Sequence, residues 1–234
     1  MRHYLTTSHY TKFTPGSPAL CPTSYDIEEI ASDRAPDVTL RFWLFKTAVD
    51  WGCTAVALPL IAALSVLLLL VNPLLNPGPL FFSQERLGKH GRVFRMWKFR
   101  TMIAAASEVR DPTAPVESGR ITLLGKVLRK FRIDELPNFF NVLGGDMSVV
   151  GPRPEAVSHA AYYNGRVAGY STRLRVKPGI TGLAQVEQGY AEDEDATSLK
   201  AKYDNMYVEC YCGRLDLYII VKTFAVMARG FGAK

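Results

Sequence analysis

The residues best suited to chemistry lie close together in one segment, residues 132–155. It holds the adjacent carboxylates Asp134 and Glu135, with Arg132 just before them and Arg153 in a Gly-Pro-Arg-Pro turn. A carboxylate can serve as a nucleophile, a general base or a metal ligand, and the planar guanidinium of arginine binds two phosphate oxygens at once. This combination therefore favours chemistry on a phosphate group.

The residues around the two carboxylates predict their local structure. Pro137 and a following glycine pair predict a short helix over residues 137–143. Leu136 precedes the proline and is expected to be extended, which leaves Asp134 and Glu135 in the turn that enters the helix. There the helix dipole and the outward-pointing N–H groups favour a bound phosphate.

A purely structural role for the same residues is the alternative. In that case Asp134 caps the helix, Glu135 pairs with Arg132, and the arginines form surface ion pairs. The segment by itself leaves both interpretations open.

Two short strands are predicted over residues 80–88 and 92–100, joined by a Gly-Lys-His-Gly turn. The second strand alternates basic with aromatic or apolar residues and carries Lys98 and Arg100 near its end. Interleaved basic and aromatic residues also occur in proteins that bind single-stranded nucleic acid. No nucleic-acid recognition motif accompanies them, so we expect no nucleic-acid partner.

A long apolar segment precedes these strands. No charged residue occurs between Trp51 and Gln84, and residues 55–75 are nearly all aliphatic, which predicts a membrane helix. Basic residues flank both ends, and such flanks favour the cytoplasmic leaflet. Pro59 lies inside the segment, where a proline removes a helix hydrogen bond and bends the axis. These facts leave open whether the helix spans the membrane or returns to the side it entered from.

The chain of 234 residues divides into three predicted parts. Residues 1–38, rich in proline, serine and threonine, are expected to form a flexible tail. Residues 39–79 form an interfacial segment and the membrane helix, and residues 80–234 form a small cytosolic domain that holds the carboxylates. The four cysteines have no disulfide-framework spacing and are expected to be reduced, as in the cytoplasm.

The expected fold class is α+β, mostly helical, with a short β-hairpin and a proline-broken membrane helix. Further helices are predicted over residues 121–131, 156–168, 198–207 and 215–231, a loop over 104–118, and a glycine turn with a short strand over 177–186. Motifs for P-loop and dinucleotide binding, zinc proteolysis and serine hydrolysis are absent from the sequence. The candidate reactive groups are therefore carboxylates with basic neighbours.

Four specific motifs follow one another along the chain. They are Trp-Lys-Phe-Arg-Thr-Met at residues 97–102, Asp-Glu-Leu-Pro with Asn-Val-Leu-Gly-Gly-Asp-Met-Ser within 134–148, Gly-Pro-Arg-Pro-Glu at 151–155, and Lys-Pro-Gly-Ile-Thr-Gly at 177–182. Together they resemble the bacterial sugar transferases, the monotopic polyprenol-phosphate phosphoglycosyl transferases. The resemblance implies transfer of a sugar-1-phosphate from a UDP-sugar to undecaprenyl phosphate with release of UMP. That reaction would initiate the synthesis of exopolysaccharide or another surface glycan.

The resemblance also implies a setting and individual roles. Mg²⁺ is the expected cofactor and membrane lipids are expected partners, with residues 80–234 as a catalytic domain on the cytoplasmic face of the bacterial inner membrane. Asp134 is the expected nucleophile, which would form a covalent phosphosugar-aspartate, and Glu135 would assist, with both carboxylates as metal ligands. Pro59 matches the proline that breaks the family's re-entrant helix, so a re-entrant helix is expected. The expected substrate-binding residues are Lys98, Arg100, Arg132, Arg153 and Glu155.

The transferred sugar and the oligomeric state depend on less specific features. A hexose-1-phosphate is expected from the resemblance alone, and the apolar C-terminal helix could become buried in a homodimer. The multi-span N-terminal domain of some family members is absent here, which favours a minimal catalytic unit. The alternative function is a catalytically silent, membrane-tethered scaffold of the same fold, against which the intact pair of Asp134 and Glu135 argues.

Overall fold

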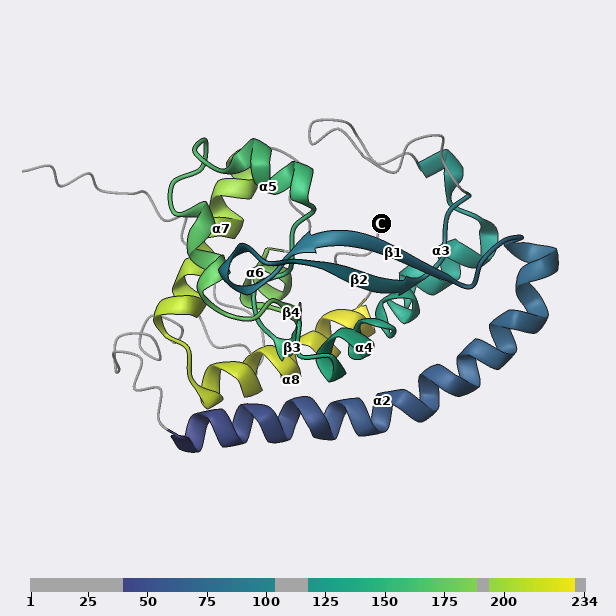
Figure 1. Ribbon diagram of the computed structural model, residues 1–234, viewed down its shortest axis with the longest axis horizontal. Helices are drawn as coiled ribbons and strands as arrows, with labels where there is room; N and C mark the ends of the chain where they lie inside the picture. Colours follow the sequence, from purple (N-terminus) through teal and green to yellow (C-terminus); the bar gives the residue numbers. More distant parts are fainter. Residues whose placement is uncertain (1–39, 104–117, 189–193, 230–234) are drawn as a thin grey trace, which may run out of the picture.

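The computed structural model describes residues 40–103, 118–188 and 194–229. Within them the protein is mostly helical and carries two two-stranded sheets, which confirms the α+β, mostly helical prediction (Figure 1). The predicted tail over residues 1–38 and nearly all of the predicted loop over 104–118 lie outside the described residues. The division into three parts therefore stays a prediction.

The elements alternate short strands with helices of very different length. The longer helices are α2 (Leu40–Leu75), α3 (Leu123–Lys130), α7 (Glu194–Glu209) and α8 (Gly213–Arg229). The shorter helices are α4 (Asn138–Leu143), α5 (Val157–Tyr163) and α6 (Leu183–Glu187). The strands are β1 (Phe81–Leu87), β2 (Val93–Phe99), β3 (Ser148–Val150) and β4 (Gly179–Thr181). Short 3₁₀ helices lie at η1 (Lys89–Gly91), η2 (Ser118–Arg120), η3 (Ile133–Glu135) and η4 (Tyr170–Arg175).

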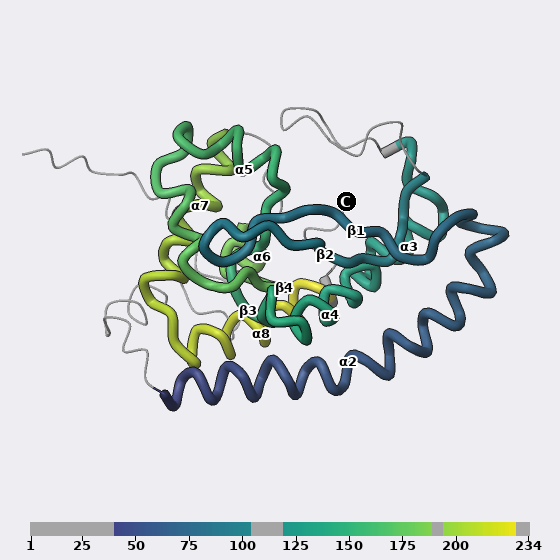
Figure 2. The backbone as a smooth tube through the Cα atoms, viewed as in Figure 1, coloured from purple at the N-terminus to yellow at the C-terminus, as the bar shows by residue number. Residues whose placement is uncertain are grey.

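Helix α2 contains the apolar segment and is long and apolar enough to cross a membrane. Only 22% of its most apolar window is buried, and large side chains such as Val56, Leu70 and Leu74 are exposed. So much exposed apolar surface is typical of contact with lipid. The helix is continuous through Pro59 and curves around the rest of the molecule, which fills its concave side (Figures 1 and 2). The fold does not test whether α2 spans a bilayer or re-enters it, so the re-entrant helix stays a prediction.

One stripe of α2 faces the remainder of the protein. Its buried side chains Ala57, Ile61 and Leu68 recur at helical spacing and share a hydrophobic cluster with Phe99 of β2 and Leu128 of α3. The same helix therefore presents an apolar outer surface and a packed inner surface.

Lys46 attaches the first half of α2 to three other elements. Its buried ammonium group donates to the carbonyl oxygen of Val150 at 2.8 Å, to Asp216 Oδ2 at 2.9 Å and to the Tyr207 hydroxyl at 3.3 Å. These partners belong to β3, α8 and α7. A buried charge is tolerated only when it is paired and hydrogen-bonded in this way.

Asp50, one turn further along α2, attaches the helix to β3. Its Oδ1 accepts hydrogen bonds from the Val149 N–H at 2.8 Å and from the Ser148 hydroxyl at 2.9 Å. Two of the three charged residues of α2 thus bind the domain instead of facing outward.

The predicted β-hairpin is confirmed, with β1 and β2 antiparallel around the turn at η1. Lys98 lies opposite Phe82 and Arg86 opposite Phe94, so both basic side chains lie on the face that also holds the buried Phe94 and Met96. The hairpin therefore presents Lys98 and Arg86 toward the interior.

Helix α4 is attached to this hairpin through Asn141. Its Oδ1 accepts from the Trp97 N–H at 3.0 Å and its Nδ2 donates to the Arg95 carbonyl oxygen at 2.7 Å. The Asn141 amide thus bonds the backbone of β2 as a neighbouring strand would. It holds the predicted helix over 137–143 against the hairpin.

Three glycines meet where β3 and β4 pair in parallel. The Gly151 N–H donates to the Thr181 carbonyl oxygen and the Gly179 N–H to the Pro152 carbonyl oxygen, both at 2.9 Å. A Cβ on Gly179 would lie 2.1 Å from the Gly151 nitrogen, and one on Gly182 would lie 2.3 Å from the Gly151 oxygen. Close backbone packing against the turn that carries Arg153 therefore requires glycine at positions 179 and 182 of the segment 177–182.

Three local predictions differ from the structure. The strand predicted to follow the glycine turn within 177–186 lies in that turn, at Gly179–Thr181, and Leu183–Glu187 form helix α6. Leu136 is helical (φ −54°, ψ −39°), not extended, because η3 runs directly into α4 and the Leu136 N–H bonds the Ile133 carbonyl oxygen at 3.1 Å. The helix predicted over 156–168 ends at Tyr163, shortly before Gly165 adopts a positive φ of +88° that interrupts it.

We expect Gly179→Ala to destabilise the fold by at least about 3 kcal/mol, since a methyl group cannot share space with the Gly151 backbone. Thermal unfolding of the detergent-solubilised protein measures this change. Gly52→Ala in α2 is the matched control, because no atom lies within 4 Å of its added Cβ, and it should unfold at the wild-type temperature or above. Wild-type stability of Gly179→Ala would contradict the packing argument.

Candidate active site

Three basic side chains converge on Glu135. Arg153 forms an ion pair with its Oε1 and also donates from Nη1 to Oε2 at 3.2 Å, and Lys98 Nζ donates to Oε1 at 3.3 Å. Arg132 Nη1 lies 4.0 Å from Oε2. The three come from the turn after β3, from β2 and from the end of α3, so distant motifs meet at one carboxylate. The pairing of Glu135 with Arg132 in the structural interpretation is therefore confirmed, but Arg153 and Lys98 bind the same carboxylate.

The charges of this cluster shift the titration of its members. Burial raises the pKa of Glu135, but Arg153 and Lys98 outweigh it and hold that pKa well below its usual range. Burial lowers the pKa of the Lys98 ammonium, and Glu135 opposes the shift. Glu135 is thus an anion engaged by cations, and a bound phosphate would meet the same cations.

Asp134 lies beside this cluster but is engaged differently. Its side chain is 7% exposed, and no hydrogen bond joins its carboxylate to any other residue that the structure describes. Burial, and then the charge of Glu135, raise the pKa of Asp134, while Lys98, Arg129 and Arg153 oppose the shift. Asp134 does not cap a helix, so that part of the structural interpretation is wrong. A desolvated, unengaged carboxylate near several cations has the properties of a nucleophile.

The backbone at Arg132 orients the two carboxylates. Arg132 has a left-handed conformation with φ +54°, which costs a residue with a side chain roughly 1–2 kcal/mol. It separates α3 from η3, so that Asp134 turns inward while Glu135 meets the cations. Such strain often occurs at functional sites. No glycine or asparagine marks position 132, and the sequence therefore holds no signal for it.

Arg100, an expected substrate-binding residue, directly follows β2, and its side chain contacts the connection between α2 and β1. Its Nε donates to the Pro79 carbonyl oxygen at 2.7 Å and its Nη2 to the Asn76 carbonyl oxygen. Asn76 Nδ2 in turn donates to the Arg100 carbonyl oxygen at 2.8 Å, and a Cβ on Gly78 would meet the guanidinium at 2.9 Å. These contacts hold the end of α2 against the hairpin, and substrate binding by Arg100 stays an untested prediction.

Glu155, another expected substrate-binding residue, lies in a second ion cluster. Its Oε1 pairs with Lys200 of α7 and with Arg173 Nη1 of η4 at 3.2 Å, and Arg173 Nη2 lies 3.1 Å from Asp204. Burial raises the pKa of Glu155, but Lys200 and Arg173 outweigh it and lower that pKa to about 2. Substrate binding by Glu155 also stays untested.

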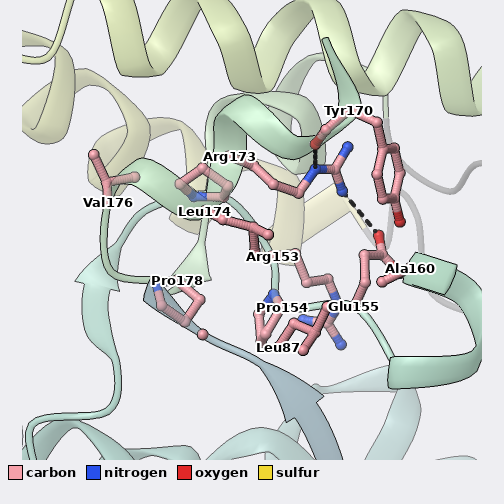
Figure 3. A pocket seen from close by; sticks show the side chains of 12 residues that line it. Leu87, Arg153, Pro154, Glu155, Ala160, Tyr170, Arg173, Leu174, Val176 and Pro178 are labelled. Atoms are coloured by element: carbon pink, nitrogen blue, oxygen red, sulfur yellow. Dashed lines mark hydrogen bonds and ion pairs between the residues drawn. The ribbon is translucent and has the colours of Figure 1, made fainter. Parts of the chain in front are cut away.

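A small cavity adjoins this second cluster (Figure 3). Glu155, Arg173, Tyr170, Pro154 and Arg153 are among the residues that line it, and Arg173 bonds both the Tyr170 carbonyl oxygen and Glu155. Its volume of about 20 Å³ suits a single water molecule. It is too small to hold a nucleotide sugar, so the Asp134 cluster remains the candidate site.

A divalent metal would find two carboxylates here, Asp134 and Glu135. No group of three or more histidine, cysteine, aspartate or glutamate side chains able to hold a metal occurs among the described residues. Both oxygens of Glu135 already accept from cations, whereas Asp134 is unengaged. Mg²⁺ commonly takes one or two carboxylates and completes its shell with water and substrate phosphates. The pair therefore fits a metal that binds together with a diphosphate.

Sequence reasoning missed three basic residues near these clusters. Arg86 donates to the Pro154 carbonyl oxygen at 3.2 Å, and pairing the two predicted strands would have placed it on the same face of the hairpin as Lys98. Arg129 acts on Asp134 from the last turn of α3, and Arg173 pairs with Glu155. Nothing local in the sequence marks Arg173, since its partners lie 18 and 31 positions away along the chain.

Comparison with known proteins covers most of the chain. The family model described as "Bacterial sugar transferase" matches residues 41–230. An Aeromonas hydrophila protein named UDP-N-acetylgalactosamine-undecaprenyl-phosphate N-acetylgalactosaminephosphotransferase is 41% identical over 189 residues, which cover 81% of this chain and 45% of that protein. Every residue of the two ion clusters lies within residues 41–230, the region that the family model matches.

Two relatives named UDP-glucose:undecaprenyl-phosphate glucose-1-phosphate transferase are also similar. The Caulobacter vibrioides protein is 38% identical over 182 residues, covering 77% of this chain and 68% of that protein. The Klebsiella pneumoniae protein is 40% identical over 179 residues, covering 71% of this chain and 38% of that protein. The chain thus spans less than half the length of the Aeromonas and Klebsiella proteins.

The low pKa of Glu155 predicts how its ion cluster contributes to stability. Because the folded-state pKa of about 2 lies below the ordinary 4.5, the contribution is complete above pH 4.5 and is lost as the pH falls through about 2. Glu155→Gln should therefore cost about 3 kcal/mol at pH 7 and about half as much at pH 3. Denaturant unfolding at both pH values measures the difference. Exposed Glu85→Gln in β1 is the control and should unfold like the wild type, whereas a pH-independent loss in Glu155→Gln would contradict the prediction.

Proposed function

The chain belongs to the bacterial sugar transferase family, and on that basis we propose that it transfers a sugar-1-phosphate from a UDP-sugar to undecaprenyl phosphate, releasing UMP. The names of its relatives support both substrates. We place the reaction at the start of exopolysaccharide or other surface-glycan synthesis.

One observation carries the mechanism we propose: a buried, unengaged aspartate lies next to a glutamate that gathers three cations. Asp134 attacks the sugar-bearing phosphorus of the donor, forming an Asp134 Oδ–P bond while the P–O bond to UMP breaks. Burial and Glu135 raise the pKa of Asp134, which makes its ionised form a better nucleophile. The result is a covalent phosphosugar-aspartate and free UMP.

Charge repulsion is the main obstacle to this step, because both reacting groups are anions. Arg153, Lys98 and Arg132 supply positive charge beside Asp134, and the donor diphosphate would replace Glu135 as their partner. Glu135 thus holds the cations in place before the donor arrives.

The second step returns Asp134 to its starting state. A phosphate oxygen of undecaprenyl phosphate attacks the same phosphorus, the Asp134 Oδ–P bond breaks, and the sugar-linked undecaprenyl diphosphate leaves. Because the two substrates react in separate steps, the site need not hold the soluble donor and the lipid together.

We also propose that Mg²⁺ is the cofactor, held by Asp134 and Glu135 together with the donor phosphates. When bound, it would neutralise phosphate charge and assist departure of UMP. The residues of the chain itself orient the donor and hold the attacking carboxylate.

We propose that α2 is a re-entrant helix of the inner membrane, with the domain on the cytoplasmic face. Its exposed apolar surface, its bend, and the position of the domain on its concave side support this arrangement (Figure 1). Lipid contact through α2 brings Asp134 to the surface where undecaprenyl phosphate resides. A homodimer through the exposed Leu217, Val221 and Phe224 of α8 stays a prediction.

The donor sugar differs among the relatives, whose names specify N-acetylgalactosamine, glucose or galactose. We propose a UDP-hexose for this chain. A silent scaffold is the alternative, and the intact Asp134 and Glu135 with their assembled cations disfavour it.

We expect UMP release beyond one equivalent per enzyme from one of a panel of UDP-sugars, dependent on undecaprenyl phosphate and Mg²⁺. Asp134→Asn should lower turnover by at least about 10³-fold, because the nucleophile is lost. Mass spectrometry of the wild type with donor alone should detect the phosphosugar adduct on Asp134, and Asp134→Asn should lack it.

Asp195→Asn, an exposed aspartate at the start of α7, is the control and should retain both turnover and the adduct. Turnover by Asp134→Asn would exclude the covalent mechanism. No UMP release with any donor, from a protein that also forms no adduct, would favour the scaffold.

The re-entrant arrangement predicts that both ends of α2 lie on the same side of the membrane. Single cysteines introduced as Arg41→Cys and Glu85→Cys, in a chain whose four native cysteines are serine, should both react with an impermeant maleimide in inverted vesicles and not in intact spheroplasts. Both should react in detergent. Labelling of the two positions from opposite sides would mean that α2 spans the membrane.

A further inference from the structure

The turn that carries Arg153 is held on both sides. Before Arg153, Gly151 packs against the backbone of Gly179 and bonds Thr181. After it, the Pro154 carbonyl oxygen accepts from Arg86 Nη1 at 3.2 Å. Arg153 is therefore placed between two constrained neighbours.

Glu155 adds the strongest constraint. Its carbonyl oxygen accepts from the Leu87 N–H at 3.0 Å, and its carboxylate pairs with Lys200 and Arg173. Arg173 is itself held by Asp204 at 3.1 Å. Glu155 thereby links the hairpin, η4 and α7 two residues after Arg153.

The surroundings of Glu155 argue against contact with a donor phosphate. Both cations lie at the same oxygen, Oε1, and the adjoining cavity of about 20 Å³ has room for one water (Figure 3). A carboxylate is also an unfavourable neighbour for a diphosphate, because both are anions.

We propose that Glu155 is a positioning residue: held by Lys200 and Arg173, it sets Arg153 against Glu135 and thereby sets the affinity for the donor diphosphate. Helix α7, which carries none of the reacting groups, takes part in donor binding through this contact. The donor-binding part of the inference rests on the proposed transferase function.

A stability cycle tests the positioning without relying on activity. No hydrogen bond or ion pair joins Glu155 and Glu135 among the described contacts, and Arg153 is the group that both act upon. If Glu155 positions Arg153, the Tm decrease of the Glu155→Gln, Glu135→Gln double variant should be smaller than the sum of the two single decreases. Additive decreases would overturn the inference, whether or not the protein turns over a donor.

Kinetics tests the consequence for donor binding. Lys200→Gln, which keeps the Arg173 contact and so a folded cluster, should raise KM for the UDP-sugar about tenfold with little change in kcat, and Lys200→Arg should restore it. Lys202→Gln, an exposed lysine on the same helix, is the matched control and should leave KM unchanged.

The two measurements separate failure of the inference from failure of the proposed function. An active wild type with an unchanged KM in Lys200→Gln would mean that the cluster around Glu155 does not set the affinity for the donor. A protein inactive with every donor would remove the transferase function, and the stability cycle would still decide the positioning role.

Discussion

The buried ammonium group of Lys46 is the contact on which the arrangement of this protein depends. It joins the long apolar helix α2 to α7, α8 and the end of β3. Removing one partner of such a buried ion pair leaves the other charge uncompensated and costs about 3–5 kcal/mol. Its bond to the Val150 carbonyl oxygen also lies directly before Gly151, where the turn that carries Arg153 begins. The long apolar helix and the candidate site are therefore attached to the same short strand.

In the candidate site, two adjacent carboxylates have opposite environments. Glu135 is a fully engaged anion, whose cations hold its pKa low, while Asp134 is desolvated and unengaged, with a raised pKa. The left-handed residue Arg132 ends α3 ahead of them, and both carboxylates lie at successive positions of the 3₁₀ turn that follows it. A desolvated carboxylate beside pre-assembled cations that do not bond it directly suits the attack on a phosphate that we propose.

Much of this arrangement could be predicted from local sequence. The hairpin and the helix after Pro137 are confirmed, since strand alternation and proline position act over a few neighbours. The extended Leu136 was wrong because the 3₁₀ turn of η3 continues into α4, and the hydrogen bond from the Leu136 N–H to Ile133 accompanies a helical conformation against the pre-proline tendency.

By itself, the sequence determined the apolar character of α2, the reactive residue types within 132–155 and the family, because composition and ordered motifs are properties of the chain. Only the tertiary structure decided which basic residue forms an ion pair with which carboxylate. Arg100 holds the end of α2, and Glu155 pairs with Arg173 and Lys200, because their partners are backbone carbonyls and side chains brought near by packing. The partner of a charged side chain is set only when folding brings the two groups together and removes the water between them.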